Sequence, residues 1–165
     1  MSVKPIPEGY HSVTPYLIVD DAAAALDFYA RAFGAKELFR MPMPALSGAE
    51  GGDRIGHAEI LIGDSHVMLA DEFPDMGHRS PKAIGGTATS LMIYLPDVDA
   101  VFAQALAAGA TQERAVENQF YGDRSGALVD PFGHKWMLAT HVEDVSPEEM
   151  DRRMKAMPPM EKAEA

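Results

Sequence analysis

The side chains best suited to chemistry gather in one short stretch of the first half of the chain. His57 and Glu59 stand two positions apart, and a Gly-Asp dipeptide that suits a two-residue hairpin turn separates them from His66. Because side chains alternate along a strand, the hairpin register places all three on one face, with Met68 opposite Glu59. A carboxylate there could act as a general base toward a carbon acid or anchor a ligand amine. Partial desolvation beside Met and Tyr side chains would raise the pKa of Glu59.

The same hairpin face carries three potential metal ligands. Imidazole nitrogens and carboxylate oxygens bind divalent ions, and His141 could join His57, Glu59 and His66 from the last predicted strand. The competing interpretation is a hydrogen-bonded polar patch at a cavity mouth or a solvated hairpin edge, since a His-x-Glu pair on a strand arises readily by chance. Glu59 itself could equally be a solvent-facing acid that aids solubility. The sequence leaves both interpretations open.

A second polar segment, Tyr-Gly-Asp-Arg-Ser-Gly, lies in the second half of the chain. Its Arg124 could fix an anionic group with two parallel hydrogen bonds, or it could form an internal pair with Asp123 that holds a hairpin bend. Four aromatic side chains could line the binding site of a planar ligand, or they could simply pack in the hydrophobic core. They are Tyr16, Tyr94, Phe120 and Tyr121. Nucleotide hydrolysis and serine-hydrolase chemistry are disfavoured, because the chain has no Gly-rich phosphate loop and no Gly-x-Ser-x-Gly elbow.

The amino-acid composition excludes several kinds of partner and of chemistry. The 165 residues, about one domain, carry 25 acidic side chains against 14 Lys and Arg, a net charge of -11. Such a surface repels phosphate backbones and anionic lipid, so we expect no nucleic-acid partner and no membrane association. The absence of cysteine excludes disulfides, thiolate metal sites and a cysteine nucleophile. With no apolar run of transmembrane length and no signal peptide, the expected location is the cytoplasm.

The elements that must position these residues form an internal repeat. In each half an apolar strand leads through an acidic cap into an amphipathic helix that stops at a Gly-Ala dipeptide, and a related strand closes the half. This order predicts an α+β fold of two βαβββ modules whose curled mixed sheets form a cup, one domain overall. The predicted parts are an N-terminal extension (1–10), a first module (11–71), a linker (72–87), a second module (88–141) and a C-terminal helix and tail (142–165).

Alternation gives each predicted strand an apolar face and a mixed face. The apolar faces are expected to pack on the two helices, so the mixed faces must line either solvent or a cavity. Two segments lie outside the repeat. Residues 43–55 are expected to form a mobile loop, and residues 146–157 a capped helix whose apolar side consists of Met150, Met154 and Met157. That side could dock on the body of the protein or on a partner subunit.

Three segments resemble the vicinal oxygen chelate superfamily, also called the glyoxalase/bleomycin-resistance/extradiol-dioxygenase group. They are residues 15–21, residues 25–35, and residues 130–136, whose Asp-Pro-Phe-Gly matches the family's Asp-Pro-x-Gly signature. Residues 120–126 and 139–146 look most like the PhnB-like branch. The resemblance implies the two-module fold over nearly the whole chain, although one scaffold hosts isomerases, dioxygenases, lyases and binding proteins.

The resemblance also implies where a metal ion would be bound. The family's metal enzymes take two ligands from each module, and these positions fall here on Thr14 and Met68 and on Ser90 and Met137. Hydroxyls and thioethers offer a hard divalent ion neither charge nor a strong nitrogen or carboxylate donor. We therefore expect no metal ion and no other cofactor, with the two Met side chains forming an adaptable apolar floor for a ligand.

Together these observations predict a glyoxalase/bleomycin-resistance-like protein that binds a small organic molecule in the cup between its modules, without the family's metal. The expected ligand-binding residues are Thr14, Tyr16, His57, Glu59, Met68, Ser90, Met92, Tyr94, Arg124 and Met137. Glu59 is also the candidate catalytic residue of one alternative, a metal-dependent or Glu-based isomerase or lyase of the superfamily. The other alternative is a non-catalytic interaction module with a filled cavity. Because modules in this superfamily pair within one chain or exchange between chains, the resemblance implies a homodimer.

Overall fold

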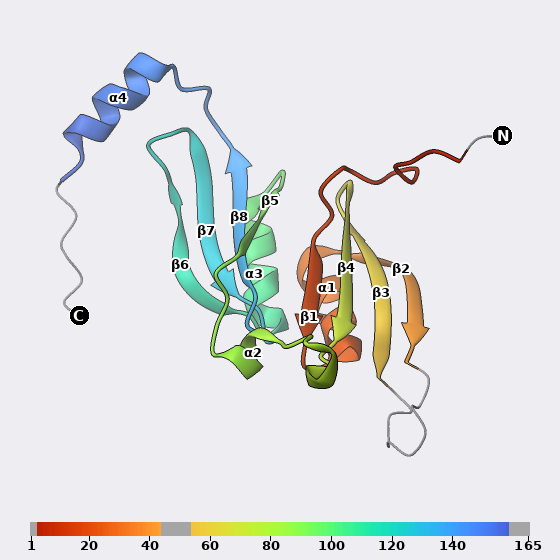
Figure 1. Ribbon diagram of the computed structural model, residues 1–165. Helices are drawn as coiled ribbons and strands as arrows, with labels where there is room; N and C mark the ends of the chain where they lie inside the picture. The colour runs from red at the N-terminus through yellow and green to blue at the C-terminus, as the bar shows by residue number, and fades with distance from the viewer. Residues whose placement is uncertain (1–2, 44–53, 159–165) are drawn as a thin grey trace.

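The computed structural model describes residues 3–43 and 54–158 (Figure 1). Its first module contains strand β1 (Tyr16–Val19), helix α1 (Ala22–Phe33) and strands β2 (Lys36–Pro42), β3 (Ile55–Ile62) and β4 (Ser65–Asp71). The strands form one sheet in the order β1-β4-β3-β2, in which β1 runs parallel to β4 and the other neighbours are antiparallel.

The second module repeats this topology. It contains strand β5 (Ser90–Tyr94), helix α3 (Val98–Ala108) and strands β6 (Thr111–Asn118), β7 (Asp123–Val129) and β8 (Lys135–His141), in the sheet order β5-β8-β7-β6. The short helices η1 (Pro74–Met76) and α2 (Pro81–Ile84) connect the two modules. The predicted α+β fold of two βαβββ modules is confirmed, and neither sheet closes into a barrel.

The two long helices begin and end as the repeat predicts. The side chains of Asp21 and Asp97 accept hydrogen bonds from backbone N–H groups at 2.9 and 3.0 Å, which caps α1 and α3. Gly34 ends α1 with φ of 67°, and Gly109 ends α3 with φ of 122°. Both values lie where a side chain would be strained, so glycine suits both helix ends.

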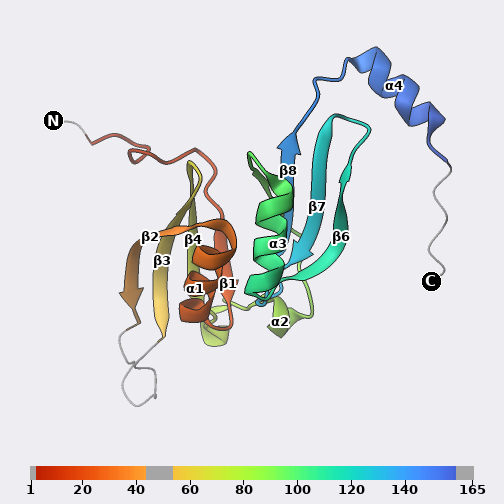
Figure 2. The ribbon, with the colours of Figure 1, turned by 180° about the vertical axis from the view of Figure 1, so that it is seen from behind.

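The two modules share one hydrophobic core. Helix α1 covers one face of the first sheet, α3 covers one face of the second, and the helices pack against each other, as the view from behind shows (Figure 2). Large core side chains come from both modules, among them Phe28, Tyr29, Phe102, Phe132 and Trp136. The two modules are thus joined through their helices, and no described helix or strand covers the other face of either sheet.

The Asp-Pro-Phe-Gly motif supplies a buried polar link between the modules. Asp130 is 4% exposed, and its Oδ2 accepts hydrogen bonds from the Tyr29 hydroxyl at 2.7 Å and from the Trp136 indole at 2.8 Å. Its Oδ1 accepts from the backbone N–H groups of Phe132 and His134. A buried carboxylate with four donors is fully satisfied, so this motif is structural.

The predicted hairpin register is confirmed. Glu59 pairs with Met68, and Ile60 pairs with Val67, across a turn in which Gly63 has φ of 60°. Residues of β3 alternate between buried positions that face α1 and less buried positions on the uncovered face. We call these uncovered surfaces the open faces of the first and second sheets.

Two segments extend beyond the modules. Helix α4 (Pro147–Ala156) forms within the predicted 146–157 stretch and projects away from the body, with Met154 and Met157 about half exposed (Figure 1). Its contacts with the rest of the chain come from Arg153, which pairs with Glu143 and donates to the carbonyl oxygen of Phe120 at 3.3 Å. Most of the predicted loop at 43–55, namely residues 44–53, lies outside the described residues. Within the described ranges no helix is long and apolar enough to cross a membrane.

Candidate functional site

A chain of hydrogen bonds crosses the open face of the first sheet and centres on Glu59. The Tyr10 hydroxyl donates to Glu59 Oε2, and the Nε2 atom of His57 lies 3.1 Å from Oε1. On its other side, His57 Nδ1 lies 3.0 Å from the hydroxyl oxygen of Tyr16. The three sequence-predicted residues His57, Glu59 and Tyr16 are therefore brought together. Both carboxylate oxygens of Glu59 are hydrogen bonded.

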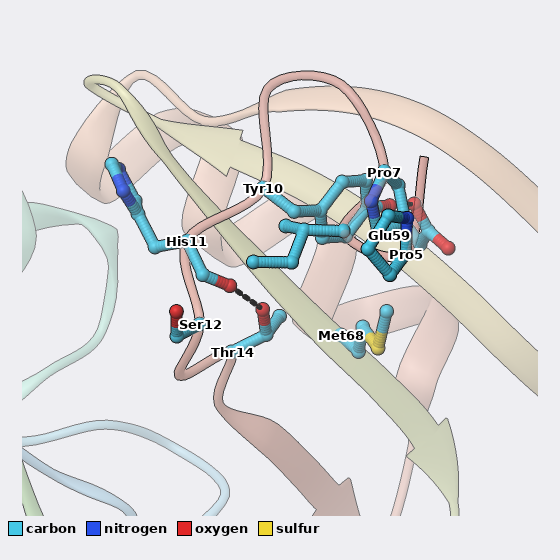
Figure 3. A pocket seen from close by; sticks show the side chains of 9 residues that line it. Pro5, Pro7, Tyr10, His11, Ser12, Thr14, Glu59 and Met68 are labelled. Atoms are coloured by element: carbon cyan, nitrogen blue, oxygen red, sulfur yellow. Dashed lines mark hydrogen bonds between the residues drawn. The ribbon is translucent and has the colours of Figure 1, made fainter. Parts of the chain in front are cut away.

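The N-terminal segment covers this network and forms a pocket with it (Figure 3). The pocket has a volume of about 430 Å³. Its lining combines the N-terminal segment with the sheet: Pro5, Ile6, Pro7, Tyr10, His11, Ser12, Thr14, Glu59 and Met68. The Tyr10 ring also stacks on the imidazole of His66, with ring centroids 4.0 Å apart. A mostly apolar cavity with one carboxylate is the kind of space that holds a small organic molecule.

The pKa of Glu59 is shifted in the opposite direction to the one that the sequence suggested. The hydrogen bond from Tyr10 is the largest cause and lowers the pKa of this carboxyl below its usual value, and the contact with His57 lowers it further. Desolvation raises the pKa, as predicted, but it is the smaller effect. The sequence-based expectation was wrong because it counted desolvation and missed the donor on Tyr10, whose own pKa the same hydrogen bond raises.

The four residues of the predicted displaced metal site do not come together. His57 and Glu59 are adjacent, but the ring of His66 is stacked on Tyr10. His141 lies on the other sheet, where its Nδ1 atom is 2.8 Å from Asp123 Oδ1. In residues 3–43 and 54–158 no three His, Asp or Glu side chains are grouped so that they could hold a metal ion.

The open face of the second sheet carries a second polar network, around Asp123. This carboxylate is 5% exposed and accepts a hydrogen bond from the Tyr94 hydroxyl at 2.9 Å. His141 bridges it to Asp144, whose Oδ1 lies 3.0 Å from His141 Nε2. The two carboxylates, Asp123 first, raise the pKa of His141. Met92 and Met137 pair on β5 and β8 on the same face, and Ser90 Oγ lies 3.8 Å from Met137 Sδ.

Arg124 lies on the opposite face of this sheet from the other predicted binding residues. Its guanidinium forms a bidentate pair with Asp99 in the first turn of α3, with both N–O distances at 2.6 Å. The predicted alternative, a pair of Arg124 with Asp123 that holds a hairpin bend, is therefore wrong, because Arg124 pairs with Asp99 of α3 and Asp123 contacts Tyr94 and His141. A guanidinium engaged in this way has few donors left for a ligand.

A second cavity, of about 500 Å³, lies between the modules. One wall is β5, and the opposite wall is the segment just before β1, residues 11–15, with the turn between β3 and β4. Thr14, Met92 and Tyr94 line it among the predicted binding residues. Apart from Arg124, the predicted set is thus divided among the open face of the first sheet, the open face of the second sheet and this crevice.

Residues 9–138 match the family model of the Glyoxalase/Bleomycin resistance protein/Dioxygenase superfamily. The chain belongs to this superfamily. It is 44% identical over 146 residues to the Mycobacterium tuberculosis protein Rv0887c. The aligned region covers 87% of this chain and 82% of Rv0887c. The crystal structure of TioX from Micromonospora sp. ML1 is similar with a TM-score of 0.59 and 27% identity, over 80% of this chain and 99% of that one. A PhnB protein from Bacillus cereus shares the fold with a TM-score of 0.59, 20% identity, and coverage of 79% and 99%.

The four residues that the resemblance places at the superfamily's metal positions do not suit a divalent ion. Met68 and Met137 offer thioethers, and the hydroxyl of Thr14 donates to the carbonyl oxygen of His11 at 3.4 Å. Ser90 lies beside Met137 and brings no charge. Hard divalent ions prefer carboxylate or imidazole donors, which none of these four residues provides.

Sequence reasoning missed three residues of these networks, namely Tyr10, Asp123 and Asp144. Tyr10 was assigned to an extension outside the modules, and Asp123 was considered only as a partner for Arg124. A tyrosine just upstream of the first strand was the available signal for Tyr10, but its target lies 49 positions away in the chain. For Asp123, alternation provides the signal: adjacent strand residues point to opposite faces, so Asp123 and Arg124 could not both face the helix.

Proposed function

We propose that this superfamily member binds a small organic molecule in the pocket beneath its N-terminal segment, without a metal ion, and that Glu59 anchors a cationic or hydrogen-bond-donating group of the ligand. One observation carries the proposal. The cavity of about 430 Å³ combines an apolar lining of Pro, Ile and Met side chains with a single carboxylate whose pKa is lowered. An ionised carboxylate in an apolar pocket attracts a positive group.

The lowered pKa of Glu59 supports an anchor over a general base. A carboxylate that is stabilised in its charged form binds a proton more weakly, so it is less able to take one from a carbon acid. Hydrogen bonds to both oxygens also hold the group in place. The isomerase or lyase alternative needs a stronger base than this. The open volume of the pocket likewise argues against an interaction module whose cavity is filled by its own side chains.

Calorimetric titration of the full chain with benzylamine, and with neutral benzyl alcohol as a comparison, tests the anchor. We expect saturable binding of benzylamine that Glu59→Gln weakens by about tenfold, because a charge-assisted hydrogen bond contributes about 1.5–3 kcal/mol. Glu8→Gln is the matched control, since it removes the same charge from an exposed residue of the N-terminal segment. Equal affinities in Glu59→Gln and wild type, or equal losses in both variants, would overturn the proposal.

We further propose that a second copy of the chain covers the open sheet faces. Large apolar side chains on these faces are about half exposed, with Tyr16 at 47%, Phe39 at 48% and Tyr94 at 61%. Exposed apolar surface of this kind is typical of interfaces. The repeat gives each module one such face. A two-fold axis can therefore pair the first sheet of each copy with the second sheet of the other copy, which buries the open faces of both copies.

A further inference from the structure

The N-terminal segment that covers the pocket is tied to the first sheet through one residue. We call residues 3–10 the strap; they form neither helix nor strand, and all of them except Tyr10 are exposed. The Tyr10 hydroxyl donates to Glu59 Oε2, and the Tyr10 ring stacks on His66 with an interplanar angle of 21°. Among the described residues no other hydrogen bond and no ion pair joins the strap to the rest of the chain. Its polar attachment therefore depends on a single side chain.

The strap is built to move as one unit. The rings of Pro5 and Pro7 restrict its backbone, and the N–H of Tyr10 donates to the carbonyl oxygen of Pro7 at 3.2 Å, which closes a turn. Ile6 is 49% exposed although it lines the pocket. Lifting the strap from the sheet therefore exposes little additional apolar surface, and a segment with few buried contacts opens at low cost in free energy.

The link through Tyr10 also occupies the group that a ligand would use. Tyr10 and Pro7 of the strap lie close to Glu59 in the pocket (Figure 3). The second carboxylate oxygen of Glu59 contacts His57, and the Glu59 side chain is only 20% exposed. A cation that binds to Oε2 must therefore replace the Tyr10 hydroxyl. The exchange favours the cation, because the displaced hydroxyl can bond to water and an ammonium group brings a full positive charge to the carboxylate.

We propose that the strap is a self-inhibitory gate: Tyr10 occupies Glu59 Oε2 and holds the strap over the pocket in the free chain, and a cationic ligand releases the strap by taking that oxygen. The gate rests on the proposed function, because it requires that Glu59 binds the ligand. It adds a second state of the chain, in which the strap is detached and Oε2 is free. Only this open state binds the ligand, so weakening the Tyr10 link should tighten binding.

Tyr10→Phe tests the gate, because it removes the donor to Glu59 and keeps the ring that stacks on His66. In calorimetric titrations of the full chain at neutral pH, we expect benzylamine to bind Tyr10→Phe about fivefold more tightly than wild type. In ¹⁵N relaxation measurements, the backbone amides of Ile6 and Glu8 should be more ordered in free wild type than in Tyr10→Phe or in wild type saturated with benzylamine. Order parameters below about 0.6 are expected for the detached strap.

Lys4→Gln is the matched control, because Lys4 pairs with Glu8 inside the strap at 3.9 Å and its removal leaves the link to Glu59 intact. Its benzylamine affinity and its strap order should match those of wild type. Equal tightening in Lys4→Gln, or a strap that stays ordered with benzylamine bound, would contradict the gate. Binding that depends on Glu59 but not on Tyr10 would refute the gate alone, whereas binding that Glu59→Gln leaves unchanged would refute the proposed function. Absence of binding in both wild type and Tyr10→Phe would refute both.

Discussion

Tyr10→Phe isolates the interaction that sets the pKa of Glu59. The substitution removes the hydroxyl that donates to Glu59 and keeps the ring that stacks on His66. A hydrogen bond to a charged group contributes about 1.5–3 kcal/mol, and partial exposure of this pair reduces the value to about 1 kcal/mol. Loss of that stabilisation of the charged form should raise the pKa of Glu59 toward its ordinary value.

The measurement is an NMR titration of the side-chain carboxyl carbons with ¹³C-labelled Glu. Tyr94→Phe is the control, because it removes a hydroxyl that donates to Asp123 on the other sheet and should leave the pKa of Glu59 unchanged. An unchanged or lower pKa of Glu59 in Tyr10→Phe would refute the reasoning. In that case desolvation or His57 would have to set the pKa, and the anchor argument would lose its basis.

The same substitution predicts a pH dependence of stability. A carboxyl whose pKa is lower in the folded than in the unfolded chain contributes stability above its unfolded pKa, and that contribution is lost as pH falls through the folded value. Tyr10→Phe should therefore reduce the free energy of unfolding most near neutral pH, by about 1 kcal/mol. The difference from wild type should shrink in acid, where Glu59 is protonated in both proteins. Urea unfolding at several pH values measures this difference, and one that grows in acid would contradict the sign.

Three further predictions concern other parts of the molecule. Asp123→Asn should lower the pKa of His141, which the imidazole proton signals report. In wild type the raised pKa of His141 contributes stability below pH about 6.5, and this contribution is lost as pH rises through the raised pKa, so the variant should be less stable than wild type mainly at low pH. An unchanged pKa of His141 would assign the effect to other groups. Asp130→Ala leaves four buried donors unpaired and should cost about 3 kcal/mol in urea unfolding, whereas Asp64→Ala at an exposed turn should cost well under 1 kcal/mol; similar costs would show that the buried link contributes little. Phe39→Ser should shift a dimer toward monomer in sedimentation velocity, and a monomeric wild type would rule out the covering copy.

Much of the fold follows from features that are local in the sequence. The strand alternation, the acidic helix caps and the Gly-Ala helix ends depend on a few neighbouring residues each, and their repetition fixes two modules of the same topology. The pairing of Glu59 with Met68 likewise follows from one tight turn. These predictions succeed because short-range geometry decides which face of a strand is apolar.

The chemistry of Glu59 could not be predicted in the same way. Its pKa depends on a hydroxyl 49 positions away, in a segment that belongs to no strand or helix. Alternation places Glu59 on the correct face but does not specify what covers that face. Desolvation alone then gives the wrong sign, because one well-placed donor to the charged form outweighs it.

The two arginines of the second module show how strand register determines which side chains lie on the open face of a sheet. Asp123 and Arg124 are adjacent in β7, so only one of them can face the open side of the sheet. Asp123 takes that side, where Tyr94 and His141 contact it, and Arg124 is directed to Asp99 at the start of α3. The open face then receives its guanidinium from Arg114 on the neighbouring strand. The irregular register of β6 concealed that residue from any argument based on strict alternation.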